Sequence, residues 1–262
     1  FLKNNNSLNE KIFNIVKNYR PQLILLGHNN ILTGNIIEQI KSKYKSKIAL
    51  WYEDHLIKGG PNYKKNLELI EKNKNLIDQY FVTTFPDSIN TSIPKNKLNY
   101  IPIPADKNIE NLEIYNSNNR YKDLFFALSH GVNYGKLKAR NIDEREIFLN
   151  ELMENNKKLT FNILGYGMEQ PKWNYHFFEE LSKCKTALNL SRGIPSKYAS
   201  SNRIASLVGN GIMTFIDRKT KYQDFFDDDE MGFYTNADDL LKQLEKLNGN
   251  INKINKISKN GK

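Results

Sequence analysis

The feature that most constrains this chain is a regular alternation of short apolar runs with helix-length segments, clearest in residues 185–239. The apolar runs have the length of strands and occupy residues 186–190, 212–216 and 232–234. A loop and a helix over residues 203–208 separate the first two runs, and a helix over residues 237–247 follows the third. Strands and helices in this order predict a parallel sheet with helices on its faces.

The rest of the chain follows the same alternation. Other strands are expected at residues 22–27, 47–52, 79–83, 98–101, 124–129 and 160–165. Other helices are expected at residues 8–19, 35–44, 67–77, 144–153 and 173–182. Residues 106–122 are rich in Asn without a sustained pattern, so they predict a connection between domains. We therefore expect one domain over residues 1–118 and another over 119–262. The tail after residue 248 either extends the last helix or forms an exposed end.

Length and composition narrow the class of protein. The 262 residues, 39% of them hydrophobic, can form two modest domains that each bury a core. The only cysteine is Cys184, which excludes an intrachain disulfide and fits a buried, inert thiol in a reducing cytoplasm. No apolar run reaches transmembrane length. The chain begins with Phe1, and its first half is small, so we expect the N-terminal domain to be truncated.

The formal net charge is +10 at pH 7, which raises the question of a polyanionic partner. Lysine is spread along the whole chain, mixed with Asn and Ile, rather than gathered in one basic segment. This distribution indicates a general composition bias, and no nucleic-acid motif accompanies it. A basic surface would still favour the phosphates of a nucleotide-sugar or anionic lipid headgroups.

The loop at residues 191–202 has the setting of an anion site. It follows an expected strand at its carboxyl end and leads into a helix N-terminus, where N–H groups and the helix dipole favour an anion. Positive charge comes from Arg192, Lys197 and Arg203, and an Arg can hold a phosphate through two hydrogen bonds. The loop begins at Ser191, and Ser201 and Asn202 are residue types that cap helices. We interpret these residues, Arg203 above all, as a pyrophosphate site.

An ordered set of short motifs carries a family resemblance. The set comprises the strand end Asn189-Leu-Ser191, the helix start Arg203-Ile-x-x-Leu207, the turn Gly209-Asn-Gly211, a strand ending in Asp217 and the segment Tyr222-x-x-Phe225-Phe226. In this order it resembles the C-terminal half of GT-B glycosyltransferases, in the family 1-type group that includes the CgeB-like proteins. The resemblance covers roughly residues 181–247. Ser206 stands where that family usually has a Glu that is expected to hold the donor ribose.

This resemblance implies an α/β fold of two Rossmann-like domains facing each other across a cleft. It implies an enzyme that transfers a hexosyl or deoxyhexosyl group from a nucleotide-diphosphate sugar, without a cofactor or bound metal. The donor would occupy the second domain and a surface-glycan or lipid-linked acceptor the first. The expected location is cytoplasmic, with peripheral contact with the inner face of an anionic membrane left open.

Two glycine-bearing segments at strand ends match the same plan. The loop after the strand at residues 124–129 contains His130, Gly131 and Lys136, which could lie under the donor phosphates. It lacks the P-loop pattern, so a plain turn is the alternative. Gly165 and Tyr166 follow another strand and either line the base or ribose or only allow the chain to turn.

The candidate catalytic residues depend on the stereochemistry of transfer. An inverting enzyme needs a general base near the acceptor hydroxyl, and His28, Asp54 and His55 follow expected strands of the first half. A retaining enzyme of this fold can use the donor phosphate to accept the proton instead. Each of the three also has a structural interpretation, as a loop hydrogen-bonding group or a helix cap. The sequence shows no His, Asp and Glu set with zinc-site spacing.

Two other functions stay open at this point. A nucleotide-sugar epimerase can share the GT-B plan, and analysis of the products would separate it from a transferase. A non-catalytic, basic polyanion-binding protein would explain the charge and Ser206 together, but the sequence shows no aromatic side chains interleaved on a basic face. No specific binding to nucleic acid is expected.

Overall fold

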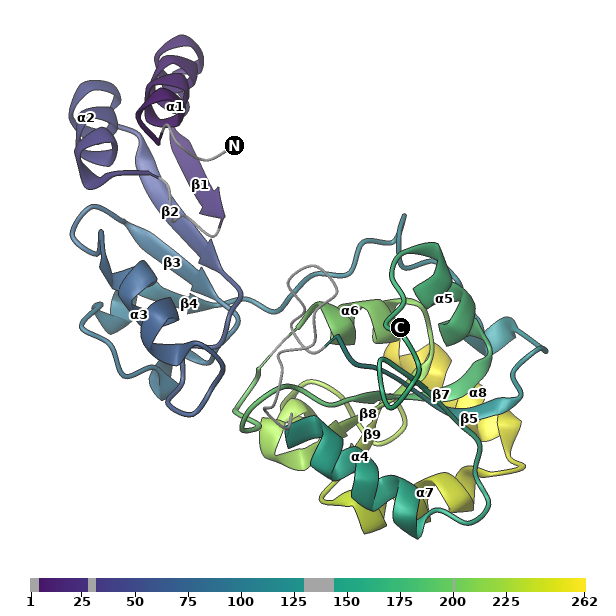
Figure 1. The fold of residues 1–262 in the computed structure, drawn as a ribbon. Helices are drawn as coiled ribbons and strands as arrows, with labels where there is room; N and C mark the ends of the chain where they lie inside the picture. Colours follow the sequence, from purple (N-terminus) through teal and green to yellow (C-terminus); the bar gives the residue numbers. More distant parts are fainter. Residues whose placement is uncertain (1–4, 28–31, 130–143, 200) are drawn as a thin grey trace. The chain divides into compact units, whose positions relative to one another are not determined.

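The computed structural model describes residues 5–27, 32–129, 144–199 and 201–262. These residues form two compact units (Figure 1). Unit 1 comprises Phe1–Pro102 with Tyr198–Ser200, and unit 2 comprises Ile103–Lys197 with Ser201–Lys262. Both units alternate strands and helices, so the predicted α/β class with two parallel sheets is confirmed.

Unit 1 contains a four-stranded parallel sheet in the order β1-β2-β3-β4. Its strands are β1 (Leu23–Gly27), β2 (Lys47–Tyr52), β3 (Gln79–Val82) and β4 (Leu98–Tyr100). Its helices are α1 (Asn5–Tyr19), α2 (Gly34–Tyr44) and α3 (Tyr63–Glu71). The core of the unit lies on one face of the sheet, where Val16 of α1, Ile37 of α2 and Ile70 of α3 pack against Leu50 and Val82.

Unit 2 contains a five-stranded parallel sheet in the order β6-β5-β7-β8-β9. Its strands are β5 (Lys122–Ala127), β6 (Phe161–Leu164), β7 (Cys184–Asn189), β8 (Met213–Asp217) and β9 (Gly232–Tyr234). Its helices are α4 (Glu144–Asn155), α5 (Tyr175–Ser182), α6 (Asn202–Gly209), α7 (Ala237–Leu247) and α8 (Ile251–Gly261). The chain adds β6 on one side of β5 and then β7, β8 and β9 on the other.

Both faces of the sheet in unit 2 are covered. One face packs its residues, Phe126 and Phe215 among them, against α4, α7 and α8. The other face packs Phe125 and Ala187 against Leu181 of α5 and Leu207 of α6. Cys184 belongs to this second cluster, and burial raises the pKa of its thiol to about 12, consistent with the expected inert thiol.

Two helices differ from the sequence prediction. The helix expected over residues 67–77 is α3, which begins at Tyr63 and ends at Glu71, because residues 72–76 form turns before β3. The Lys- and Asn-rich tail forms a separate helix, α8, after a turn at Gly249, where φ is +84°. Ile254 and Ile257 of α8 are buried in the core, so the tail is neither an extension of α7 nor an exposed end.

The segment expected to connect the domains packs on unit 2, so the observed units divide after Pro102 rather than after residue 118. The N–H of Ile114 donates to the backbone carbonyl of Asn210 at 3.0 Å. The N–H of Leu112 donates to Asn210 Oδ1 at 3.1 Å, and Asn210 Nδ2 donates to the carbonyl of Ser206 at 2.7 Å. The buried Asn210 therefore joins this segment to the end of α6.

Replacement of Asn210 by Ala should lower the free energy of unfolding by about 1–3 kcal/mol, because it removes a buried side chain that bonds the N–H of Leu112 and the helix-end carbonyl of Ser206. Urea unfolding followed by circular dichroism measures this change. Asn111→Ala is the matched control, since Asn111 is an exposed residue of the same segment and bonds only the nearby carbonyl of Asn108. Equal stability of the two variants would contradict the role given to Asn210.

Candidate functional site

The strand order of unit 2 reverses at the carboxyl ends of β5 and β7. The chain leaves β5 toward β6 on one side and returns to β7 on the other. In open α/β sheets, ligands bind where the strand order reverses in this way, outside the carboxyl ends of the strands. In unit 2 that point lies between Ala127, the last residue of β5, and the Asn189-Leu190 end of β7.

Arg203 lies at this point. It is the second residue of α6, as the sequence predicts for the first turn of that helix. Its Nη1 donates to the carbonyl of Leu190 at 2.9 Å, and its Nη2 donates to the carbonyl of Ala127 at 3.3 Å. The guanidinium also lies over the ring of Phe126, with its central carbon 5.0 Å from the centroid. These contacts hold a cation at the reversal of the strand order.

The N-terminus of α6 is arranged differently from the expected cap. Ser201 is the N-cap residue with extended backbone, but its side chain makes no capping hydrogen bond, and its buried Oγ has no partner in the described structure. Asn202 is the first helical residue and is exposed, so it does not cap the helix either. The first-turn N–H groups of a helix have no intrahelical acceptors. Without a side-chain cap they suit an anion.

The other predicted donor-loop residues lie between β7 and α6. Ser191, Arg192 and Lys197 are half-buried in this loop.

Gly165 follows β6 with φ +73°, and a Cβ there would come within 1.9 Å of the carbonyl oxygen of Leu128. Close approach to the chain after β5 therefore explains this glycine without a ligand. Three predicted donor residues, His130, Gly131 and Lys136, lie outside the described residues.

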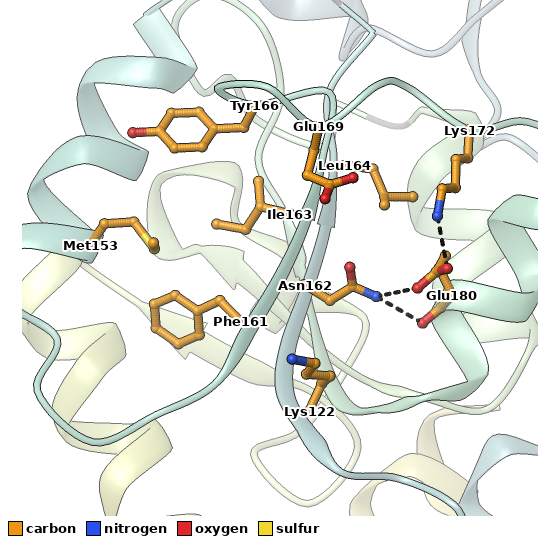
Figure 2. Close-up of a pocket in the computed structure, with 10 residues that line it drawn as sticks. All are labelled: Lys122, Met153, Phe161, Asn162, Ile163, Leu164, Tyr166, Glu169, Lys172 and Glu180. Carbon is orange, nitrogen blue, oxygen red and sulfur yellow. Dashed lines mark hydrogen bonds and ion pairs between the residues drawn. The ribbon is translucent and has the colours of Figure 1, made fainter.

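Tyr166 lies at the open edge of β6 rather than beside Arg203. Its hydroxyl bonds to Asn150 Oδ1 of α4, and it lines a cavity of about 390 Å³ on this edge (Figure 2). Figure 2 shows apolar side chains, Met153 and Phe161 among them, on one side of the strand, and polar side chains, Asn162 and Glu180 among them, on the other.

In unit 1, Asp54 and His55 follow the carboxyl end of β2. Asp54 is exposed and His55 half-buried. Three hydrogen bonds fix this segment: Thr83 Oγ1 donates to the carbonyl of Glu53, Asn66 Nδ2 to the carbonyl of His55, and the N–H of Leu56 to Thr84 Oγ1. The third predicted base, His28, lies outside the described residues.

The environment of His55 favours a neutral imidazole. Burial lowers its pKa, and the nearby carboxylate of Asp54 opposes that change without reversing it. Its Nδ1 is buried and has no hydrogen-bond partner in the part of unit 1 that the structure describes. A neutral histidine with an unoccupied ring nitrogen beside a carboxylate can accept a proton, which is the property required of a general base.

Two residues at the carboxyl ends of β5 and β7 were not among the predicted site residues. Phe126 places its ring under Arg203, and Asn189 ends β7 with a side chain that is 3% exposed. Asn189 Oδ1 has no hydrogen-bond partner among the described residues. The sequence signal that could have identified Asn189 was an Asn at the end of an apolar strand. Nothing in the pattern distinguished Phe126 from a core residue.

Other polar residues have structural explanations. Asp217, at the end of β8, accepts a hydrogen bond from the N–H of Lys219 at 2.7 Å and caps a short 3₁₀ turn. Within the described ranges, no group of three His, Cys, Asp or Glu side chains could hold a metal ion. A search of the same residues finds no helix with the length and apolar character needed to cross a bilayer.

Comparison with protein families gives a match for the C-terminal part of the chain. Residues 140–262 match the family described as glycosyl transferase-like. This range contains β6 to β9 and Arg203. A search of curated proteins finds no match.

Solved structures share the fold of the whole chain. HepE of Anabaena, in complex with UDP-glucose, is 11% identical, with a TM-score of 0.61 over 97% of this chain and 76% of HepE. TarM is 10% identical, with a TM-score of 0.59 over 100% of this chain and 54% of TarM. Sucrose-phosphate synthase of Thermosynechococcus elongatus is 11% identical, with a TM-score of 0.57 over 99% of this chain and 73% of that enzyme.

These comparisons define the class of the protein. The solved structures show the GT-B fold, and the family match adds the glycosyl transferase-like character of the C-terminal part. The predicted resemblance to GT-B glycosyltransferases, with the enzyme class that it implies, is confirmed.

Glu180, at the edge cavity, predicts a specific acid dependence of stability. Burial alone would raise its pKa, but hydrogen bonds from Lys172, Asn162 and Lys183 outweigh burial and lower the pKa from 4.5 to about 2. Because the pKa is lower in the folded state, ionised Glu180 stabilises the fold above pH 4.5, and this stabilisation is lost as the pH falls from 4.5 toward 2. Glu180→Gln should remove this part of the pH dependence.

Urea unfolding at several pH values between 2 and 6 measures the change. Glu179→Gln is the control, since Glu179 is a more exposed neighbour that bonds Lys183 at 3.4 Å. The Glu180→Gln curve should be flatter than those of the parent and the control. Parallel curves for all three proteins would show that the Glu180 network does not affect stability.

Proposed function

We propose that the protein transfers a hexosyl or deoxyhexosyl group from a nucleotide-diphosphate sugar to a surface-glycan or lipid-linked acceptor. The observation that carries this proposal is the position of Arg203, held by the carbonyls of Ala127 and Leu190 where the strand order reverses. A guanidinium and an uncapped helix N-terminus at that point match the chemistry of a pyrophosphate. We place the activity in the cytoplasm.

A uridine diphosphate sugar is the first donor to test. HepE of Anabaena, which shares the fold, was crystallised with UDP and with UDP-glucose. In this proposal Arg203 and the first turn of α6 hold the diphosphate. The other donor-side residues are His130, Gly131, Lys136, Gly165, Tyr166, Ser191, Arg192, Lys197, Ser201 and Asn202. Ser206 lies one turn after Arg203, so a group other than a carboxylate would meet the ribose there.

The acceptor side in this proposal is unit 1. In an inverting transfer, a base from His28, Asp54 and His55 removes the proton of the acceptor hydroxyl as the glycosidic bond to the diphosphate breaks. The diphosphate leaves with the bonding electron pair, and Arg203 stabilises its negative charge. In a retaining transfer, the leaving diphosphate takes the proton instead, and no base from unit 1 is needed.

Arg203→Ala should weaken binding of a nucleoside diphosphate by about 10- to 150-fold, because charge-assisted hydrogen bonds contribute roughly 1.5–3 kcal/mol. Arg203→Lys should recover only part of the affinity, since Lys cannot make two parallel bonds. Titration calorimetry with UDP, GDP, ADP and CMP measures this effect. The nucleoside without phosphates should bind the parent and both variants equally.

Arg218→Ala is the matched control, because Arg218 is an exposed arginine of unit 2 that contacts Asp228 at 3.8 Å. Circular dichroism and thermal unfolding confirm that each variant is folded. Equal diphosphate affinity of parent and Arg203→Ala would remove Arg203 from the donor site. Stronger binding of random DNA than of any nucleotide would favour a polyanion-binding protein instead.

Single Ala variants of Asp54 and His55 test the acceptor side. If transfer is inverting and one of them is the base, its replacement should lower kcat by roughly 100-fold or more while donor affinity stays unchanged. Product anomers determined by NMR establish whether transfer inverts, and His28→Ala completes the set. Full activity of all three variants of an inverting enzyme would exclude a base among them.

A further inference from the structure

Asn189 is a buried polar side chain at the end of β7 whose role the fold does not explain. It is 3% exposed, and its Oδ1 has no hydrogen-bond partner in the described ranges of the chain. Strands flank it on both sides, since β7 lies between β5 and β8 and Asn189 pairs with Ile216 of β8. Proteins bond nearly all buried polar groups, because an unbonded one lowers stability. Asn189 therefore requires a partner that the described residues do not supply.

The alternation of side chains along β7 places Asn189 on the face of the sheet that α6 covers. Leu188 belongs to the core that α4, α7 and α8 share, and Ala187 belongs to the core that α5 and α6 share. Because successive residues of a strand point to opposite faces, Asn189 lies on the same face as Ala187. The next residue, Leu190, accepts the hydrogen bond from Arg203 Nη1. The unbonded amide thus adjoins a contact that fixes Arg203.

Two hydroxyl groups in the loop after β7 are also buried and unbonded. The Oγ atoms of Ser196 and Ser201 have no partner among the described residues. With Asn189 they give three such side chains in the described part of residues 189–201, which run from the end of β7 to the N-terminus of α6. Their occurrence in the one segment that leads to Arg203 points to a shared ligand rather than to three unrelated packing defects.

The chemistry of these groups matches a sugar hydroxyl. An amide oxygen only accepts hydrogen bonds, and so do the oxygens of an ionised diphosphate, so a diphosphate at Arg203 cannot bond Asn189 Oδ1. A hydroxyl both donates and accepts, so it can bond either end of an amide, or a serine. Amide and serine side chains carry no formal charge, which suits a neutral part of a ligand. A nucleotide-sugar carries hydroxyls on both sides of its diphosphate, on the ribose and on the transferred sugar.

We propose that Asn189 is a specificity-determining residue of the donor site and bonds a sugar hydroxyl of the nucleotide-sugar. The inference rests on the proposed function, because it takes the ligand of Arg203 to be the diphosphate of a donor. Arg203 binds the charged part of that donor, and Asn189 binds a neutral part next to it. The ribose and the transferred sugar both offer the required hydroxyl, and nucleotides that lack one or the other distinguish them.

Replacing Asn189 should leave the stability of the ligand-free protein intact, because no hydrogen bond is lost. Asn189→Val and the smaller Asn189→Ala are each compared with the same substitution at Asn162. Asn162 belongs to β6 of the same sheet, and its Nδ2 donates to Glu180 Oε2 at 3.0 Å. Calorimetric unfolding should show a melting temperature lower by roughly 2 °C or more for the Asn162 variants only. An equal fall for both Asn189 variants would reveal a structural partner of Asn189 and overturn the proposal.

Titration calorimetry with three ligands identifies the hydroxyl. Asn189→Ala should bind UDP-glucose roughly 5-fold or more weakly than the parent, because a hydrogen bond to the ligand is lost. If the hydroxyl belongs to the transferred sugar, the affinity for UDP should not change. If it belongs to the ribose, the affinity for UDP should fall by the same factor, and 2′,3′-dideoxy-UDP should bind both proteins equally. Unchanged affinity for UDP-glucose and UDP, or an equal loss for all three ligands, would contradict the role of Asn189.

The Arg203→Ala variant separates this inference from the proposed function. If Arg203→Ala loses affinity for UDP while Asn189→Ala binds UDP and UDP-glucose as the parent does, only the inference about Asn189 fails. If Arg203→Ala binds UDP as the parent does, the donor site is misplaced and both fail. Should another base bind the parent more tightly than uracil, the three ligands are replaced by the corresponding nucleotides of that base.

Discussion

The right-handed connection between parallel strands governs the main features of both units. In unit 2 the strand order reverses at β5, so helices cover both faces and the carboxyl ends of β5 and β7 mark the point of reversal. Arg203 lies at this point. In unit 1 the described strands are added in one direction only, so the helices share one face and Leu23 and Leu25 are exposed on the other. One topological constraint thus accounts for the position of the candidate donor site and for the placement of the helices of unit 1 on one face.

The setting of Arg203 favours an anion over a neutral ligand. Two backbone carbonyls and the face of Phe126 orient the guanidinium at the ends of β5 and β7. The N-terminus of α6, which no side chain caps, adds positive potential at the same place. A diphosphate would supply negative charge to both groups.

Much of the fold was predictable because apolar runs of strand length reveal buried parallel strands directly. The strands at residues 47–52 and 212–216 and the position of Arg203 at the start of a helix follow from such runs and their flanking loops. The tail was harder to predict, since Ile254 and Ile257 are the apolar residues that α8 buries and Lys and Asn dominate its sequence. Tertiary contacts were still harder to predict from the sequence. Asn210 bonds Leu112 at the end of α6, and Phe126 lies under Arg203, through contacts between distant residues that no local pattern records.

The stability of unit 1 and the geometry of its candidate base are linked through β2. This strand places Ile48, Leu50 and Tyr52 in the core of the unit and ends at the segment that holds Asp54 and His55. Hydrogen bonds from Thr83 and Asn66 fix that segment to neighbouring elements of the same unit. Burying an exposed leucine contributes roughly 1.5–3 kcal/mol, and a whole domain has a net stability of only about 5–15 kcal/mol. With so small a margin, the packing of β2 in the core is a significant part of what positions His55.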